Sequence, residues 1–323
     1  MNNDIIISIV TPAYNAAETL PRLYETICSQ TFRQFEWIVV NDGSSDNTLE
    51  ILNMLIKNSP FQCRIIDQDN QGVSRARNCG LSAANGQYIF FADADDYLSP
   101  DSLEVLYQAI LPGYDFTFGN HVPQWKDGKV IRQWHYPYQS YVFKNIGKLF
   151  MRICRGKVKM FASEGLYKRS IINGNSLRFN TTLTHTEDDL FLYQYLCYCR
   201  NAIHLNRDVY HYVLGDKNSI YIISKKRMQG TARALEILKE TMKLQSIPEK
   251  YARAFENSIF REKFALLFHL YFKQFRSLDF LELPEIKALE KRITRNTFND
   301  LKSLKDLIRL KGFFLLYNRI LNS

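Results

Sequence analysis

The sequence predicts an α/β protein with a mostly parallel sheet flanked by helices and with a C-terminal helical extension. Over the first part of the chain, short β-branched or aromatic runs alternate with stretches of helical period. This order requires crossover connections, which are typical of parallel sheets with right-handed crossovers. After residue 223 the pattern changes to long helical periods. We therefore expect two domains, at residues 1–222 and 223–323.

The expected strands are apolar runs that end at polar, turn-forming residues. They lie at 5–10, 35–40, 64–66, 88–92 and 114–118. A continuous apolar run such as 5–10 is typical of a strand buried on both faces. Helices are expected at 18–30, 48–56, 73–84, 99–109, 187–199 and 251–275. Ligands of such sheets bind beyond the carboxyl ends of the strands, so the polar clusters after Val10, Val40 and Ala92 are candidate site segments.

Composition and charge exclude several classes of protein. With 46% hydrophobic residues, the chain of 323 residues is too apolar to be disordered. No segment approaches the roughly 18 uncharged apolar residues of a membrane span, and the first residues lack a signal-peptide pattern. Six cysteines without a CxxC pair indicate neither a zinc site nor a disulfide framework, and they favour a reducing cytoplasm. The net charge of +9 leaves nucleic acid, an anionic membrane and an anionic small molecule as partners.

Three carboxylates, Asp93, Asp95 and Asp96, follow the fourth expected strand almost without spacing. Carboxylates this close repel one another unless a cation or hydrogen bonds compensate their charge. Oxygen ligands suit Mg²⁺ or Mn²⁺, which complete their shells with phosphate oxygens and water. The alternative is an acidic loop in which Asp96 or Asp101 caps the next helix.

Polar residues after the other strands are suited to a nucleotide. Asp42, at the end of a buried strand, can accept the imide N–H of a uracil, and Tyr14 can lie flat against a base. Asn70 and Arg77 flank a helix start, where N–H and guanidinium groups suit an anion. Each of these segments is also compatible with an ordinary turn or helix start.

Two further carboxylates, Glu187 and Asp188, open a helix later in the chain. Carboxylates at a helix start commonly cap the helix or complement its dipole. A catalytic base has the same sequence pattern, a carboxylate at a helix end that faces a pocket. An expected polar loop follows with His211, Tyr212, Lys217 and Ser219, where cationic and hydroxyl groups can close over a diphosphate.

Together and in this order, these segments resemble the family 2 glycosyltransferases of GT-A fold. The stretches that carry the resemblance are 8–15, 39–46, 70–72, 76–78, 85–88, 91–98 and 187–188. They cover about the first 220 residues. Each stretch alone is weak evidence, but the ordered set is highly specific.

The resemblance implies a Rossmann-like domain that binds a nucleotide sugar, with UDP favoured. The residues implied to frame the base and nucleoside are Thr11, Pro12, Ala13, Tyr14, Asp42, Asn70 and Arg77. Asp93, Ala94 and Asp95 match the DxD motif of the family, which implies that Asp95, with Asp93, holds Mn²⁺ or Mg²⁺.

The resemblance also implies the roles of the later residues. Asp188 is implied as the catalytic base, with Glu187 shaping its surroundings. His211, Lys217 and Ser219 match the family's diphosphate loop only loosely, because Val213 stands where many members have arginine.

The implied reaction is transfer of one sugar with inversion, in which Asp188 takes a proton from the attacking hydroxyl. The Gln-x-x-Arg-Trp motif of processive polysaccharide synthases is absent from the sequence, which indicates a single transfer. The family implies a glycan or lipid-linked acceptor in bacterial surface polysaccharide or lipooligosaccharide synthesis. The candidate acceptor-binding side chains are His121, Trp125, Trp134 and His135.

The tail at residues 301–323 carries five basic residues against one acidic residue. Leu301, Leu304 and Ile308 share one helical face, and Lys302, Lys305 and Arg309 share another. This pattern suits a helix lying on an anionic leaflet, which would make a cytoplasmic protein peripheral at the inner face of the cell membrane. The alternatives are a helix docked on the protein core and an interface of a homodimer.

Three other interpretations compete with a glycosyltransferase. A sugar nucleotidyltransferase would need a glycine-rich basic loop after the first strand, and residues 11–17 have neither property. A nucleic-acid-binding protein would need basic residues interleaved with exposed aromatics, whereas the basic excess here is diffuse and weighted to the tail. We therefore expect no nucleic acid partner. A non-catalytic adaptor would not need Asp93, Asp95 and Asp188.

Overall fold

The computed structural model describes residues 4–131, 136–154, 157–183, 185–214, 225–249 and 251. The chain forms two compact units. The first comprises residues 1–149, 159–183 and 187–220, and the second comprises 150–158, 184–186 and 221–323. The predicted roles of Trp134, His135, Lys217 and Ser219, nearly all of the helix expected at 251–275, and the tail lie outside the described residues.

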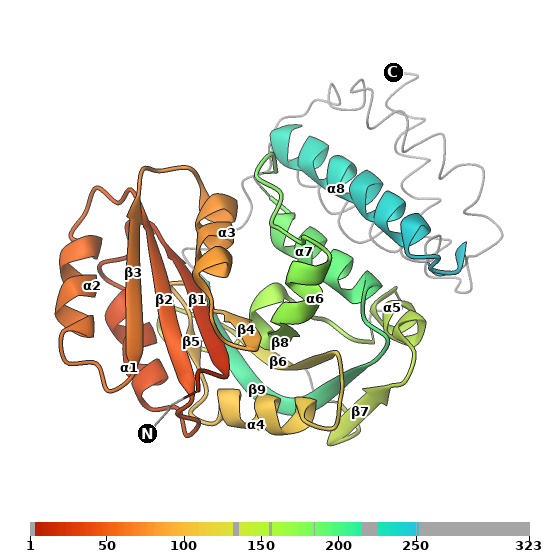
Figure 1. The fold of residues 1–323 in the computed structure, drawn as a ribbon, viewed down its shortest axis with the longest axis horizontal. Helices are drawn as coiled ribbons and strands as arrows, with labels where there is room; N and C mark the ends of the chain where they lie inside the picture. Colours follow the sequence, from red (N-terminus) through yellow and green to blue (C-terminus); the bar gives the residue numbers. More distant parts are fainter. Residues whose placement is uncertain are drawn as a thin grey trace. The chain divides into compact units, whose positions relative to one another are not determined.

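The first unit begins with strands and helices in strict alternation (Figure 1). These are β1 (Ile7–Ala13), α1 (Leu20–Cys28), β2 (Phe35–Asp42), α2 (Thr48–Ile56), β3 (Gln62–Gln68), α3 (Val73–Ala83) and β4 (Tyr88–Phe91). The elements that follow are β5 (Tyr97–Leu98), α4 (Ser102–Ile110), β6 (Phe116–Trp125), β7 (Ser140–Phe143), the 3₁₀ helix η1 (Ala162–Glu164), β8 (Gly165–Lys168), α6 (Arg169–Gly174), α7 (Glu187–Cys197) and β9 (Ala202–Leu214).

The described strands join in one sheet of order β3-β2-β1-β4-β8-β6-β9-β5, and β7 pairs with β9 as well. The strands β1 to β4 are parallel to their neighbours, as predicted. β8 runs antiparallel between β4 and β6, and β6 is again parallel to β9. The α/β class with a mostly parallel sheet is therefore confirmed.

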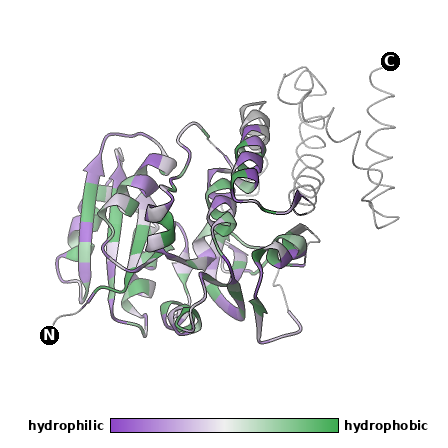
Figure 2. Ribbon diagram, turned by 45° about the vertical axis from the view of Figure 1, so that its right-hand side comes forward, coloured by the Kyte–Doolittle hydropathy of each residue, from purple (hydrophilic) through white to green (hydrophobic). Residues whose placement is uncertain are grey.

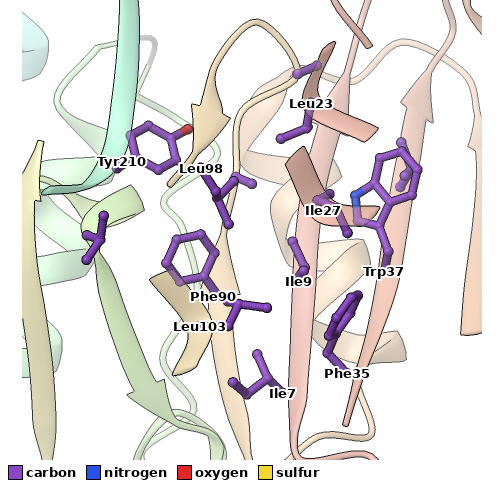
Figure 3. Packing of buried hydrophobic residues seen from close by; sticks show 14 of the residues in the cluster. Ile7, Ile9, Leu23, Ile27, Phe35, Trp37, Phe90, Leu98, Leu103 and Tyr210 are labelled. Carbon is purple, nitrogen blue, oxygen red and sulfur yellow. The ribbon is translucent and has the colours of Figure 1, made fainter. Parts of the chain in front are cut away.

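Side chains along a strand point alternately to the two faces of the sheet, and β1 and β2 are buried at every residue. Both faces of the central sheet are therefore covered. Ile7, Ile9 and Phe90 face the layer that contains Leu23 and Leu103 of the helices α1 and α4 (Figure 3). Figure 2 shows hydrophobic and hydrophilic segments alternating along the strands of this sheet.

The opposite face of the sheet carries α3. A Cβ added to Gly80 of this helix would lie 2.4 Å from Cγ1 of Val10, so only glycine allows this approach to β1. Close packing of α3 brings its first turn to the carboxyl edge of the sheet, where the candidate site residues were expected.

The C-terminal part of the first unit differs from the sequence prediction. His211 and Tyr212 lie in β9 and not in a polar loop, so that expectation was wrong. β9 contains His204, Arg207 and Asp208 within its length, which break the apolar pattern that identified the other strands.

The second unit includes α8 (Lys225–Leu244), which begins where the pattern of the sequence changes. The helix α5 (Ile146–Cys154) contributes residues to both units. No helix in the described part of the chain is both long enough and apolar enough to cross a bilayer.

Candidate active site

The loops after β1 and β2 are joined through Asn15. Its backbone N–H donates to Oγ of Ser44 over 3.0 Å, and its side-chain Oδ1 accepts the N–H of Ser45 over 2.9 Å. Asn15 has a φ of 49°, a left-handed conformation that asparagine tolerates better than most residues. The two loops therefore hold one another at the carboxyl edge of the sheet.

Asp42, the predicted ligand of the base, is buried and shapes the loop after β3. Its Oδ1 accepts hydrogen bonds from Nε2 of Gln68 at 2.7 Å and from the N–H of Gln71 at 2.9 Å. Its Oδ2 accepts the N–H of Gly72 at 2.8 Å. The carboxylate thus fixes the segment that contains Asn70 and leads into α3.

Gly43 allows the loops after β2 and β3 to touch. Its φ is +67°, and a Cβ at this position would lie 2.5 Å from the backbone nitrogen of Asn70. Both the conformation and the lack of space favour glycine over any other residue.

The four residues predicted to frame the base differ in their exposure. Thr11 is buried, and its Oγ1 accepts a hydrogen bond from Nε1 of Trp37 at 3.0 Å. Pro12 and Ala13 are also buried. Tyr14 is 54% exposed, so its ring is the one in this group that can meet a ligand.

Arg77 connects the predicted metal motif to the predicted base motif. Its Nη2 lies 2.7 Å from Oδ1 of Asp93, and its Nη1 lies 3.5 Å from Oε1 of Glu187. Its guanidinium also lies 5.2 Å from the ring centroid of Phe179. Burial alone would lower the pKa of Arg77, but attraction to Asp93, and more weakly to Asp188 and Glu187, raises it above its ordinary value.

Asp93 and Asp95 follow β4 as predicted, with Ala94 buried between them. Desolvation, and then the charge of Asp93, raises the pKa of Asp95. Arg22 partly offsets this effect, and its Nη2 donates to the backbone oxygen of Asp95. Arg77 pairs with one oxygen of Asp93, and burial and the charge of Asp93 still raise the pKa of Asp95, so the two side chains suit Mg²⁺ or Mn²⁺, which take few protein ligands. The described residues contain no cluster of three or more potential metal-binding side chains.

Asp96 is not a helix cap. Its Oδ2 accepts the hydroxyl of Tyr210 at 2.9 Å, and its Oδ1 accepts the N–H of Val213 at 2.7 Å. The same hydroxyl accepts the N–H of Asp93 at 2.9 Å. Burial, and then the charges of Asp95 and Asp93, raises the pKa of Asp96 well above its ordinary value. Asp96 therefore anchors β9 beneath the DxD segment, and Asp101 occupies the N-cap position of α4 without a capping hydrogen bond.

Glu187 and Asp188 begin α7, and the residue before them, Thr186, has a φ of 66°. Glu187 is buried, and desolvation followed by the charge of Asp188 raises its pKa. Oδ1 of Asp188 accepts the N–H of Asp189 at 2.8 Å. Oδ2 of Asp188 makes no hydrogen bond within the described residues, so it can accept a proton from a ligand.

His211 does not face the carboxylates of the DxD segment. Its ring stacks on Tyr97 with centroids 4.4 Å apart, and Oγ of Ser99 lies 3.0 Å from its Nε2. Burial lowers the pKa of His211. These contacts give the side chain a packing role, and they leave its predicted contact with a diphosphate unsupported.

Tyr212, which was expected with His211 in a polar loop but was not among the implied site residues, lies in β9 near the carboxylates. It is 44% exposed, and burial together with the charges of the nearby carboxylates raises the pKa of its hydroxyl to about 12. Those carboxylates are Asp96, Asp95, Asp93 and Asp188. Tyrosines at 210 and 212 recur with the period of a strand, which is the signal that identifies β9 here.

The structure thus brings together Arg77, Asp93, Glu187 and Asp188 in one charged cluster with Asp95 beside it. The segment of Tyr14, Asp42 and Asn70 forms a second group around the loops after β1, β2 and β3.

Comparisons with known proteins give the context for this geometry. Residues 8–172, just over half of the chain, match the family model described as glycosyl transferase family 2. The chain is 28% identical over 246 residues to EpsH of Bacillus subtilis (strain 168), which carries a glycosyltransferase name, and the match covers 74% of this chain and 71% of EpsH.

Two solved structures share the fold. TarS 1–349 of S. aureus in complex with UDP-GlcNAc aligns with a TM-score of 0.69 and 18% identity, over 88% of this chain and 79% of that chain. The mannosyltransferase PcManGT of Pyrobaculum calidifontis, in complex with GDP-Man and Mn²⁺, aligns with a TM-score of 0.58 and 15% identity, over 96% of this chain and 79% of that chain. The fold is therefore the GT-A fold, and the chain is an enzyme that belongs to glycosyltransferase family 2.

Proposed function

We propose that the protein transfers one sugar from a nucleotide sugar, with UDP as the favoured nucleotide, to a hydroxyl of a glycan or lipid-linked acceptor, with inversion. The observation that carries this proposal is the ion pairing of Arg77 with both Asp93 and Glu187. One buried guanidinium thereby couples the DxD segment, where a diphosphate would bind, to the helix start that bears Asp188. The catalytic domain is residues 1–222 in this proposal.

The nucleoside end of the donor would bind at the loops after β1, β2 and β3. The exposed ring of Tyr14 offers a face for a base. Oδ2 of Asp42 accepts a single hydrogen bond, from Gly72, and has capacity for an imide N–H. UDP is supported by Asp42 and by the UDP-GlcNAc bound to TarS, whereas the GDP-Man bound to PcManGT makes GDP the nucleotide to test against it.

The diphosphate and a divalent cation would lie at Asp93 and Asp95. Asp93 gives one oxygen to Arg77, and Asp95 lies beside it with a raised pKa. When bound, Mn²⁺ or Mg²⁺ neutralises the charge that grows on the departing nucleoside diphosphate. Arg77 holds Asp93 in place for this role, and Arg22 holds the backbone of Asp95.

Asp188 would act as the general base. Its unpartnered Oδ2 can take the proton of the acceptor hydroxyl while that oxygen attacks the anomeric carbon from the side opposite the diphosphate. Such a displacement inverts the anomeric centre. Glu187, paired with Arg77, fixes the first turn of α7 and so the direction in which Asp188 points.

A role in cell-surface polysaccharide synthesis is supported by curated relatives such as the hyaluronan synthase of Pasteurella multocida, which is 40% identical over 111 residues. That match covers only 11% of the synthase. Its product is therefore no guide to the product of this chain, and a single transfer remains the proposal.

A donor screen tests the proposed function. The full chain is incubated with UDP-GlcNAc, UDP-glucose, UDP-galactose and GDP-mannose, with MnCl₂ or with EDTA, and nucleoside diphosphate release is measured. We expect release from at least one UDP-sugar and loss of release in EDTA. Pyrophosphate release would indicate a nucleotidyltransferase, and no release from any donor would indicate a non-catalytic adaptor; either result contradicts the proposal.

A further inference from the structure

A buried histidine and glutamate pair lies on β6 and η1, outside the charged cluster. Nδ1 of His121 is 2.8 Å from Oε2 of Glu164, and the two residues are 8% and 0% exposed. Oε1 of Glu164 accepts the N–H of Phe161 at 3.0 Å. Both oxygens of the glutamate are therefore engaged, and the imidazole ring is held in one orientation.

The other ring nitrogen of His121 has no hydrogen-bond partner among the described residues. The His121 side chain keeps 9% of its surface exposed. A ring whose Nδ1 is bound to a carboxylate presents Nε2 as an acceptor when neutral and as a donor when protonated. A sugar hydroxyl both donates and accepts, so it can pair with Nε2 in either state.

Phe161 adds an apolar surface beside this nitrogen. Its side chain is 41% exposed, and its ring meets the ring of His121 at 81° with centroids 4.3 Å apart. An exposed aromatic face next to a positioned polar atom is the composition expected of a small-molecule site. The C–H faces of a pyranose pack on aromatic rings while its hydroxyls take the polar group.

The pairing of the sheet places this group near the candidate active site. Phe90 of β4 pairs with Leu166 of β8, and Glu164 directly precedes β8. His121 of β6 pairs with Tyr210 of β9, whose hydroxyl donates to Asp96 and accepts the N–H of Asp93. β8 and β6 lie on the side of β4 away from β1, which leads into the proposed nucleoside loops. A sugar that projects from the diphosphate, or that approaches it, would therefore meet this side of the sheet.

We propose that Nε2 of His121 and the ring of Phe161 form a subsite for a pyranose, with Glu164 as the positioning residue that holds the imidazole. This proposal rests on the proposed glycosyltransfer and assigns the sugar-binding side of that same site. The pyranose is either the sugar of the donor or a sugar of the acceptor. The experiment below measures donor binding and acceptor binding separately.

The variants are His121→Gln and Phe161→Leu, with Phe161→Trp as the variant that keeps an aromatic face. The donor arm measures Kd by calorimetry in MnCl₂ for UDP alone and for the nucleotide sugar that the donor screen selects, or UDP-GlcNAc if it selects none. The acceptor arm uses saturation-transfer NMR with the methyl β-glycosides of glucose, galactose and N-acetylglucosamine in the presence of UDP. Because the glycosides are probed directly, this arm does not depend on turnover.

If the subsite binds the donor sugar, His121→Gln and Phe161→Leu should each raise the Kd of the nucleotide sugar about tenfold and leave the Kd of UDP unchanged. An acceptor subsite predicts that both variants lose most of the glycoside signal without a change in either Kd. Phe161→Trp should keep binding in both cases. His204→Gln is the matched control, since His204 is a fully buried histidine on β9 that stacks on Phe118.

Folded variants that bind nucleotide sugar and glycosides as the wild type does would overturn the subsite. A wild-type chain that binds no glycoside and holds the nucleotide sugar no better than UDP would overturn it as well. Failure of the glycosyltransfer proposal would appear separately, as a wild type that releases no nucleoside diphosphate from any donor.

Discussion

At the scale of single residues, Arg77 explains how the candidate active site tolerates so many carboxylates. It is buried, and it pairs with Asp93 on one side and Glu187 on the other. Removing one partner of a buried ion pair leaves the other charge uncompensated in a medium of low polarity, which costs more than the pair itself contributes.

Arg77→Met should lower the free energy of unfolding by about 3 to 5 kcal/mol near neutral pH. Burial and Asp188 already raise the pKa of Glu187, and without Arg77 it should rise further. An acid whose pKa is higher in the folded state loses stability as pH rises through that pKa. Urea unfolding should therefore show a smaller deficit near pH 5 than near pH 7. Arg75→Met, on the exposed side of the same helix, is the control, and an equal deficit at both pH values would contradict the pairing.

Asp188→Asn keeps the size of the side chain but cannot take a proton. We expect kcat to fall by roughly two to four orders of magnitude, because that is the usual contribution of a general base, while the Kd of the nucleotide sugar stays the same. Transfer kinetics and calorimetry on the same preparation check this. Asp189→Asn is the neighbouring control, and near-normal turnover of the Asp188 variant would remove the base assignment.

At the scale of elements, the loops after β2 and β3 depend on Gly43. Its φ of +67° and the 2.5 Å approach to Asn70 leave no place for a side chain. Gly43→Ala should destabilise the protein and weaken UDP binding about tenfold or more, because the loop fixed by Asp42 must move. Gly113→Ala is the control that separates backbone strain from steric overlap. Gly113 has a φ of +102°, but nothing lies within 4 Å of an added Cβ. We expect that variant to lose stability and to keep its affinity for UDP, as measured by calorimetry and thermal unfolding.

A comparison of predicted and observed helices and strands shows which elements can be identified from the sequence. The helix predicted at 48–56 has the same bounds in the structure, and the strands from β1 to β4 were found. β1, β2 and β4 were recognisable because strands buried on both faces give continuous apolar runs. β5, β7, β8 and β9 were missed. β8 has four residues, and β9 carries charged residues within a long pairing, so neither has the apolar signature.

For the candidate site, the sequence identified the separate motifs but not the contacts between them. Sequence spacing selected the DxD segment and the start of α7, but the bridge between them is a contact across 110 residues that no local pattern contains. Tyr212 was not among the predicted site residues, and His121 was an acceptor candidate without its partner Glu164, because the surroundings of these residues are created by sheet pairing. The individual roles in binding and catalysis remain predictions.

At the scale of the whole molecule, the net charge of +9 divides into two functions in our proposal. Arg77 lies within the charged cluster, while the tail at 301–323 holds a net +4 on a sequence of helical period. Each basic residue near an anionic leaflet contributes roughly 1 kcal/mol, so the tail could hold the enzyme at a membrane.

Co-sedimentation with liposomes tests the tail. The full chain should bind vesicles that contain phosphatidylserine, binding should weaken in high salt, and a chain of residues 1–300 should bind much less. Vesicles of phosphatidylcholine alone are the control. Equal binding by both chains would exclude the tail as the membrane contact and favour the core-docked or dimeric alternative.

The loops after β1, β2 and β3, which form the proposed nucleoside site, contact one another, and these contacts limit how the nucleotide preference can be changed. Asn15 joins the first loop to the second, and Asp42 and Gly43 join the second to the third. A graft of one loop from a relative with a different nucleotide preference would break contacts on its neighbours. Nucleotide preference in this chain should therefore be exchangeable only when residues 14–17, 41–47 and 68–72 are transplanted as one cassette.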